Sequence, residues 1–259
     1  MKITKKNYYS KKANKEYFSV SQYKSFMECE AKAMAEIRGE WIQEKTTALL
    51  VGSYVDAYFE GSLDTFKLKN PEIFKKDWTL KADYTQAEQI IERIKSDALF
   101  MQFLSGKTQV IKTGLINGTP FKIKMDSYYR GKMIVDLKIL RSCERVMGMS
   151  PIQYWNYDVQ GAVYQYIEGN KLPFYLAIAT KEKVTDIAIV ELDQEDMNKE
   201  LELLMKRLPR FIAIKNQERE PVGCQICDYC KSVKKLTHPI KAYELGFSSY
   251  DINFINGKF

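Results

Sequence analysis

The sequence of 259 residues has no run of about 18 apolar residues, the length that a membrane-spanning helix needs. The first residues, Met-Lys-Ile-Thr-Lys-Lys, have no apolar segment behind them, so we do not expect a signal peptide. Cysteine is also scarce, with five residues, of which three cluster at Cys224, Cys227 and Cys230. An odd, clustered set does not fit the disulfide framework of a secreted protein. We therefore expect a soluble globular protein of the cytoplasm with no membrane partner.

Apolar residues are plentiful enough for a large core, since 45% of the chain is hydrophobic and 13% is aromatic. A chain of this length can bury one large core, or one core and a small appendage. The formal net charge is +7, and lysine-rich segments lie near both ends. A basic balance agrees with nucleic-acid binding but does not establish it. We expect a basic arm at residues 1–18, a main domain at 19–220 and a basic, cysteine-containing tail at 221–259.

Apolar periodicity divides the chain into helices and strands. Helices are predicted at Ser21–Gly39, Thr46–Glu60, Tyr84–Leu104, from Pro151 or Asp158 to Glu168, and at Gln194–Asn216, with an irregular stretch at Gly61–Asp83. Strands are predicted at Thr108–Ile116, Phe174–Thr180 and Asp186–Leu192, and as a pair within Phe121–Leu140 that turns at Arg130-Gly131. Because Asn117-Gly118 is a strong hairpin signal, the first three strands should form an antiparallel meander.

Within the predicted hairpin, Asp136 and Lys138 lie two residues apart on the second strand, so their side chains leave from the same face. Charges on so apolar a strand are costly unless they are paired or bind a metal. Asp126, on the preceding strand, can bring a second carboxylate beside Asp136. Two adjacent carboxylates repel each other, and a divalent cation relieves the repulsion. Together with the backbone carbonyl of Leu137, these residues predict a site for Mg²⁺ or Mn²⁺; an ordinary salt bridge is the alternative.

Three further residues carry candidate roles. Asp56 follows Gly52 by one helical turn on a largely apolar element, and Gly52 would permit a close backbone approach. An unpaired carboxylate there would be costly, so Asp56 needs a hydrogen-bond partner or a cation. Gln160 and Tyr164 are four residues apart on a predicted helix and therefore share one face. A packed helix face with a satisfied amide is the alternative for this last pair.

Taken in order along the chain, these residues resemble the motifs of PD-(D/E)xK nucleases of the RecB type. Gly52-Ser-Tyr-Val-Asp56 resembles that family's Gly-x-x-x-His segment, and Asp126 with Asp136-Leu-Lys138 resembles its metal site. Gln160-x-x-x-Tyr164 resembles its Gln-x-x-x-Tyr motif. The stretch from Ser19 to Cys230 is similar to the RecE-like exonucleases of phages and prophages, as is the run Cys-Asp-Tyr-Cys-Lys-Ser-x-Lys-Lys-Leu that begins at residue 227.

This resemblance implies an α/β, restriction-endonuclease-like fold, with a central mixed, largely antiparallel sheet flanked by helices. The implied metal ligands are Asp56, Asp126, Asp136 and the Leu137 carbonyl. Lys138 would orient the water or stabilise the charged transition state, and Gln160 and Tyr164 would position the site or the DNA end. Tyr128, Tyr129 and Trp155 near the site suit stacking on an unpaired strand.

The resemblance also implies a biological setting. A RecE-like enzyme is a Mg²⁺-dependent exodeoxyribonuclease that degrades one strand from linear double-stranded DNA ends. The expected partners are those DNA ends, a single-strand annealing protein and further copies of the chain in a homo-oligomeric ring. The expected location is the cytoplasm of a bacterial host. Two other functions stay open, namely a structure-specific or restriction-like endonuclease and a non-catalytic DNA-binding accessory protein, although the intact Asp126, Asp136 and Lys138 argue against the latter.

Two features depart from the pattern of the family. The family has His where this chain has Asp56, and the only histidine, His238, is no obvious substitute. A carboxylate nevertheless suits a hard cation such as Mg²⁺. In addition, some RecB-type nucleases bind a 4Fe–4S cluster through an N-terminal cysteine and a C-terminal trio, here matched by Cys29 with Cys224, Cys227 and Cys230. The spacing of this trio differs from theirs, so an iron–sulfur cluster, zinc and free thiols all stay open.

Overall fold

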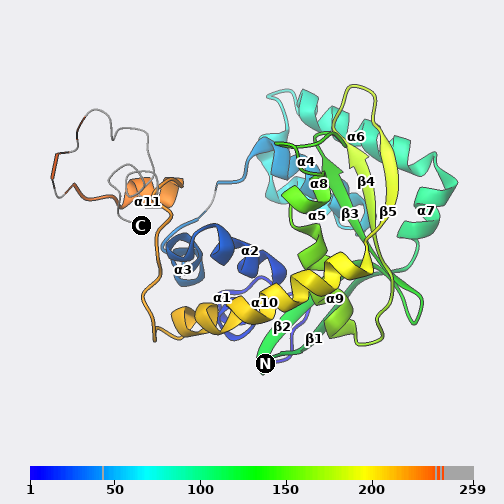
Figure 1. Ribbon diagram of the computed structural model, residues 1–259. Coiled ribbons are helices and arrows are strands. Elements are labelled where there is room, and N and C mark those ends of the chain that lie inside the picture. The colour runs from blue at the N-terminus through cyan, green and yellow to red at the C-terminus, as the bar shows by residue number, and fades with distance from the viewer. Residues whose placement is uncertain (43, 237, 240, 242–259) are drawn as a thin grey trace. The chain divides into compact units, whose positions relative to one another are not determined.

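The computed structural model describes residues 1–42, 44–236, 238–239 and 241 (Figure 1). The chain forms two compact units. Unit 1 comprises Met1–Val20 and Glu44–Leu208, and unit 2 comprises Ser21–Gln43 and Pro209–Phe259. The end of the predicted basic tail, residues 242–259, lies outside the described residues. No helix among the described residues is both long and apolar enough to cross a membrane.

A five-stranded sheet with the order β1-β2-β3-β4-β5 forms the centre of unit 1 (Figure 1). The strands are β1 (Lys107–Ile116), β2 (Thr119–Tyr129), β3 (Met133–Leu140), β4 (Phe174–Thr180) and β5 (Ile187–Glu191). Neighbours are antiparallel except for β3 and β4, which are parallel. Parallel neighbours need a crossover, and the connection from β3 to β4 contains two helices. The predicted α/β fold with a mixed, largely antiparallel sheet is therefore confirmed.

Tight turns fix the register of the meander. Asn117 and Gly118 both have positive φ, 46° and 75°, as a two-residue hairpin turn of the primed type requires. Nine residue pairs then join β1 to β2, from Lys107 opposite Tyr128 to Ile116 opposite Thr119. The second hairpin turns at Gly131, whose φ is 69°. Its ladder is much shorter, because β2 and β3 pair at only three positions, and this early separation of the strands opens the sheet beside Asp126.

The N-terminal segment occupies part of the edge of β2 that β3 leaves. Phe18 donates its N–H to the Pro120 carbonyl at 2.8 Å and accepts from the N–H of Lys122 at 2.9 Å. The buried Lys122 ammonium binds the carbonyl of Tyr8 and, at 2.6 Å, the side-chain oxygen of Asn14. The segment predicted as a basic arm is thus packed against the sheet. The sequence of this segment shows no apolar periodicity, because single residues bind it to the sheet and no amphipathic helix face does so.

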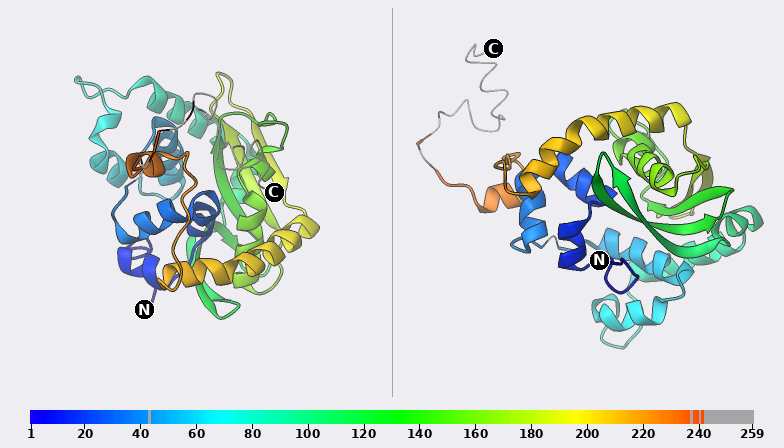
Figure 2. Two further views of the ribbon diagram at one scale, coloured as in Figure 1. Left: turned by 60° about the vertical axis from the view of Figure 1, so that its left-hand side comes forward. Right: turned by 90° about the horizontal axis from the view of Figure 1, so that it is seen from below.

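Helices cover both faces of the sheet in unit 1 (Figure 2). Its helices are α1 (Lys11–Glu16), α4 (Thr47–Phe59), α5 (Leu63–Lys69), the short 3₁₀ helix η1 (Pro71–Ile73), α6 (Ala82–Lys95), α7 (Ala98–Leu104), α8 (Pro151–Tyr154), α9 (Tyr157–Glu168) and the first part of α10 (Gln194–Lys215). On one face, α4 and α6 pack against Val135, Leu137 and Ala177 in the main core. The opposite face is covered by α9, so side chains that alternate with Val135 and Leu137 along β3 face α9.

Three details in unit 1 differ from the prediction. The single helix expected at Tyr84–Leu104 is two helices, because the Asp97 carboxylate accepts from the Phe100 N–H at 2.9 Å and starts α7. The stretch expected to be irregular contains α5, whose Leu63 and Phe66 pack against the main core although neither is fully buried. A Cβ added to Gly52 would meet nothing within 4 Å, so this glycine is not needed for a close approach.

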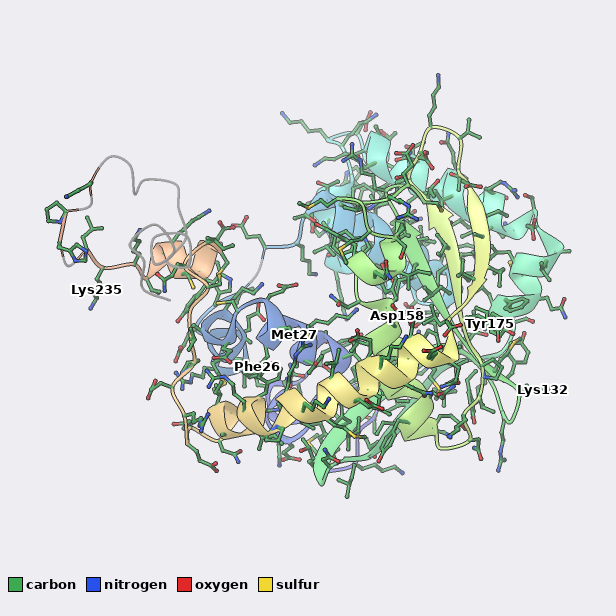
Figure 3. The ribbon with its side chains drawn as sticks, viewed as in Figure 1. Phe26, Met27, Lys132, Asp158, Tyr175 and Lys235 are labelled. Atoms are coloured by element: carbon green, nitrogen blue, oxygen red, sulfur yellow. The ribbon has the colours of Figure 1, made fainter. Side chains whose placement is uncertain are left out.

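Unit 2 consists of α2 (Val20–Glu28), whose first residue closes unit 1, with α3 (Glu30–Arg38), the second part of α10 and α11 (Asp228–Ser232). The sequence predicted one helix from Ser21 to Gly39, whereas the structure has two that meet at Cys29. The Cys29 sulfur accepts from the Lys32 N–H at 3.4 Å, as an N-cap does. Phe26 (labelled in Figure 3) stacks on Phe211 with ring centres 5.1 Å apart. The prediction missed the break at Cys29 because the apolar spacing continues through it and because cysteine is rarely an N-cap.

Candidate active site

Asp136 is the most buried acidic residue of the candidate site. It lies on the face of β3 that α9 covers, and 3% of the residue is exposed. Its Oδ1 accepts from the Gln160 side-chain amide at 2.6 Å, and its Oδ2 binds the Lys138 ammonium. Both oxygens of this buried carboxylate are therefore paired, which is what its burial requires. The two-residue spacing of Asp136 and Lys138 on one strand face brings the ion pair together.

Asp126 fills the opening between β2 and β3. Its Oδ2 accepts from the backbone N–H of Leu137 at 3.1 Å, so a side chain replaces a backbone acceptor at the end of the ladder. Its Oδ1 accepts from the side-chain amide of Gln109 at 3.2 Å. In a strand, the N–H and C=O of one residue point toward the same edge. The Leu137 carbonyl therefore also faces the Asp126 side.

Asp56 comes from α4 and shares a small pocket with Asp126 and Leu137. The volume of this pocket is about 20 Å³, which has room for about one water-sized species. The remaining lining residues are Phe59, Glu60, Leu104, Thr108 and Gln109. Asp56 is separated from Asp126 by 69 intervening residues, so a distant helix supplies a carboxylate to the opening in the sheet.

The charges in and around the pocket interact strongly. Burial raises the pKa of Asp56 to about 7, with the Lys138 ammonium opposing the rise and Asp136 adding to it. Burial, followed by the charges of Asp136 and Asp56, raises the pKa of Asp126 well above its usual range. Burial alone would lower the pKa of Lys138, but Asp136 and Asp126 outweigh it and raise that pKa. Lys138 therefore stays cationic, while the three carboxylates repel one another.

These residues fit a hard divalent cation. Carboxylate and backbone carbonyl oxygens are the donors that Mg²⁺ takes, and a cation would relieve the repulsion that raises the pKa of Asp126. The three carboxylates are not, however, drawn into one tight ligand set. Among the described residues, only four cysteines have ligand atoms that all lie within 4.8 Å of one another. The hydrogen bonds of Asp136 explain this, since both its oxygens are directed at Lys138 and Gln160.

Gln160 and Tyr164 share one face of α9, as their spacing predicts, but they make different contacts. Gln160 reaches Asp136, whereas the Tyr164 hydroxyl donates to the Lys124 carbonyl of β2 at 3.1 Å. Tyr164 is buried. It therefore fixes α9 to the strand that carries Asp126, two residues further on.

Several residues around the site were not singled out from the sequence. Gln109, which binds Asp126, has a left-handed φ of 55° within β1, and no sequence signal marks that conformation. The Tyr157 ring lies 5.2 Å from the Lys138 ammonium, and Tyr157 precedes Gln160 by three residues on α9. The same helical spacing that selected Gln160 and Tyr164 could therefore have included Tyr157.

The tyrosines proposed for stacking on DNA are differently placed. Tyr128 is buried, and its hydroxyl donates to Glu168 at 2.6 Å. The Tyr129 hydroxyl binds the carbonyl of Gln102 in the preceding helix. Trp155 is half exposed, at the end of α8. The structure therefore removes Tyr128 from the stacking candidates, because its ring serves the interior of unit 1.

Comparison with known proteins agrees with the fold. The family described as a PDDEXK-like domain of unknown function (DUF3799) matches residues 19–233. The crystal structure of a proposed exonuclease from Eubacterium rectale matches with a TM-score of 0.92 and 47% sequence identity, covering 95% of this chain and 98% of that chain. A second structure, described as SSO0001, covers 85% of this chain and 96% of its own at 15% identity, and its TM-score of 0.32 supports no argument.

No curated protein matches the chain. The family match and the Eubacterium rectale structure both extend over most of the sequence. The residues that the family matches include Asp56, Asp126, Asp136 and Lys138. The PD-(D/E)xK-like fold that the resemblance implied is thereby confirmed. The chain belongs to the DUF3799 family of PDDEXK-like domains.

Proposed function

We propose that the protein is a divalent-metal-dependent exodeoxyribonuclease that degrades one strand from the ends of linear double-stranded DNA. The observation that carries the proposal is that Asp56 and Asp126 line one pocket with Leu137, the residue that lies between the ion-paired Asp136 and Lys138 on β3. The 47% identity to a proposed exonuclease supports the same class of reaction.

The residues available to hold the metal are Asp56, Asp126, Asp136 and the carbonyl of Leu137. When bound there, Mg²⁺ or Mn²⁺ supplies positive charge at the scissile phosphate and makes a nearby water more acidic. Asp56 contributes an oxygen donor where the RecB-type pattern has an imidazole, and oxygen is the preferred ligand of Mg²⁺.

The chain's own groups supply the rest of the chemistry. Lys138 keeps its proton because Asp136 and Asp126 raise its pKa, so it can stabilise the negative charge that develops on the phosphate. Gln160 holds the Asp136 carboxylate in one orientation through Oδ1. The Tyr164 hydroxyl binds the Lys124 carbonyl and so holds α9, which carries Gln160, against β2, which carries Asp126. Lys138 is therefore the catalytic cation, whereas Gln160 and Tyr164 are positioning residues.

The proposed preference for DNA ends, and not for an internal base sequence, follows from the kind of DNA contact that a basic chain makes. The net charge of +7 favours contacts with phosphates, and such contacts carry no base sequence information. The resemblance to RecE-like exonucleases extends the proposal to a homo-oligomeric ring that acts with a single-strand annealing protein in phage-type recombination within the bacterial cytoplasm. These wider roles depend on the nuclease activity and are tested after it.

Incubation with matched linear and covalently closed circular plasmid tests the proposal. With Mg²⁺, we expect steady release of nucleotides from the linear DNA, an intact circle, and no hydrolysis without a divalent cation. The Asp136→Asn variant, purified in parallel, serves as the control for contaminating nucleases. Discrete fragments, or equal loss of the circle, would favour the endonuclease alternative. Binding to DNA without hydrolysis under every metal condition would favour the accessory protein.

A further inference from the structure

Four of the five cysteines come together in unit 2, and none of them is among the residues proposed for nuclease chemistry. They are Cys29, Cys224, Cys227 and Cys230, and their sulfur atoms all lie within 4.8 Å of one another. The Cys230 sulfur is 3.6 Å from that of Cys29 and 4.0 Å from that of Cys224. None of the four forms a disulfide, and the two separations are about twice the length of such a bond.

The surrounding backbone is arranged for negatively charged sulfur. Cys29 accepts from the N–H groups of Lys32 and Cys224, both at 3.4 Å. Cys224 accepts from the N–H of Cys227 at 3.3 Å, and Cys227 accepts from the N–H of Cys230 at 3.5 Å. Hydrogen bonds of this kind favour the thiolate, which is the form that binds metals. Four thiolates packed together would repel one another strongly without a cation between them.

We propose that these four cysteines bind one Zn²⁺ ion as a closed, tetrahedral, structural site. With a Zn–S bond of about 2.3 Å, the edge of the sulfur tetrahedron is about 3.8 Å. The 3.6 and 4.0 Å separations lie on either side of that value. A 4Fe–4S cluster binds each of its four thiolates to a different iron, and this requires larger separations than a tetrahedron around one ion. The geometry therefore selects a single ion from the possibilities that the sequence left open.

Such a site would fasten together segments of unit 2 that lie far apart in the sequence. Cys29 is 195 residues from Cys224. The same two segments are also joined by the Glu30 carboxylate, which binds the Arg210 guanidinium at 2.7 Å and accepts from the Val222 N–H at 2.8 Å. Small units with limited cores commonly depend on a metal in this way. Four protein ligands leave no open coordination position, so the zinc would hold structure and take no part in hydrolysis.

Metal analysis of the full-length protein tests the inference without any assay of DNA hydrolysis. After removal of loosely bound Mg²⁺ by brief treatment with EDTA, we expect about one zinc per chain and neither stoichiometric iron nor acid-labile sulfide. Iron with sulfide and a brown chromophore would overturn the proposal in favour of a cluster. If the native protein holds no stoichiometric metal as purified and these four cysteines react rapidly with Ellman's reagent, the proposal would be overturned in favour of free cysteines.

Variants give a matched comparison. Cys230→Ser should lower the zinc content at least severalfold and lower the melting temperature, whereas Cys143→Ser, at the exposed fifth cysteine, should change neither. If Cys230→Ser fails to fold, growth of the wild type with Co²⁺ keeps the test decisive. Intense charge-transfer and visible bands of tetrahedral thiolate-bound Co²⁺ would support the site, and an octahedral Co²⁺ spectrum would overturn it. Because these readouts do not involve nuclease activity, they succeed or fail independently of the proposed function.

Discussion

Gln160 on α9 donates a 2.6 Å hydrogen bond to Oδ1 of Asp136 on β3. Since Lys138 binds Oδ2 of the same carboxylate, Asp136 is held from both sides and cannot turn freely. Removing an outer partner of this kind typically costs 10–100-fold in metal affinity or activity. The bond from the Tyr164 hydroxyl to the Lys124 carbonyl also fixes α9 to the neighbouring strand β2, so the contact belongs to a fixed frame.

We expect Gln160→Ala to lower activity by about 10–100-fold and to raise the Mg²⁺ concentration needed for half-maximal rate, because Asp136 loses its fixed orientation. Titration of the rate with Mg²⁺ measures both effects. Gln165→Ala is the matched control, since Gln165 lies on the same helix but binds the Leu172 carbonyl and Gln194. It should lower stability while leaving the Mg²⁺ dependence unchanged. An identical Mg²⁺ titration for Gln160→Ala and the wild type would exclude a positioning role.

Asp136→Asn and Lys138→Ala should each lower the rate of DNA hydrolysis by on the order of 10²-fold or more, because each removes a charge from the reacting centre. Single-turnover rates on linear duplex DNA provide the measurement. Lys132→Ala is the control, as Lys132 is exposed in the turn between β2 and β3 (Figure 3) and its loss should change the rate by no more than about twofold. Full activity in either site variant would remove this hairpin from the mechanism.

The third prediction follows from the pKa of Asp56, which burial raises from an ordinary value near 3.8 to about 7. Between these two values the folded protein binds more protons than the unfolded chain. In magnesium-free buffer, the contribution of Asp56 to the free energy of unfolding should therefore decrease as the pH rises from about 4 to about 7, and then level off. Mg²⁺ should restore stability more at pH 8 than at pH 5, because it binds the ionised carboxylates.

Denaturant unfolding at several pH values, with and without Mg²⁺, measures this dependence. Asp56→Asn cannot ionise, so its stability should decrease less over the same pH range than that of the wild type. The variant should also gain less from Mg²⁺ at pH 8. Parallel pH profiles for the two proteins would show that Asp56 is not held at a raised pKa in the folded state.

The sequence predicted much of the sheet because its signals are local. Asn117-Gly118 and Gly131 each form a turn with positive φ, and in the strand between them Phe121, Ile123 and Met125 alternate with polar residues. Their hairpin brings Asp126, Asp136 and Lys138 together, as the spacing predicts. The roles assigned to these residues stay predictions until the variants are assayed.

Contacts between segments that are far apart in the sequence could not be predicted from local sequence patterns. No periodicity indicates that Phe18 pairs with β2 beside the site, or that Gln109 turns into a left-handed conformation to reach Asp126. Helix breaks at Cys29 and Asp97 were also missed, because apolar spacing continues through both positions. In each case a single side-chain hydrogen bond to the backbone decides the local structure.

Glu168, at the end of α9, provides the last prediction, which concerns how α9 is anchored. Its side chain is fully buried and accepts from the Tyr128 hydroxyl at 2.6 Å and from the Lys112 ammonium at 2.9 Å. Burial raises the pKa of Glu168, but hydrogen bonds from Tyr128, Lys112 and Asn170 outweigh it and lower the pKa to about 2. Glu168 therefore joins β1 and β2 to the helix that carries Gln160.

Because the folded pKa of Glu168 lies below the ordinary value of 4.5, its stabilising effect is present above about pH 4.5 and is lost as the pH falls through about 2. Glu168→Gln should therefore cost about 1–3 kcal/mol of stability at pH 7, as expected for buried hydrogen bonds to a charged group. The difference from the wild type should shrink below pH 4.5. Glu191→Gln is the matched control, because Glu191 is exposed and accepts a single hydrogen bond from Tyr175 at 3.0 Å. It should change stability by no more than about 0.5 kcal/mol. Chemical unfolding at pH 7 and at pH 3 measures all three proteins, and a cost for Glu168→Gln that is the same at both pH values would contradict the assigned ionisation.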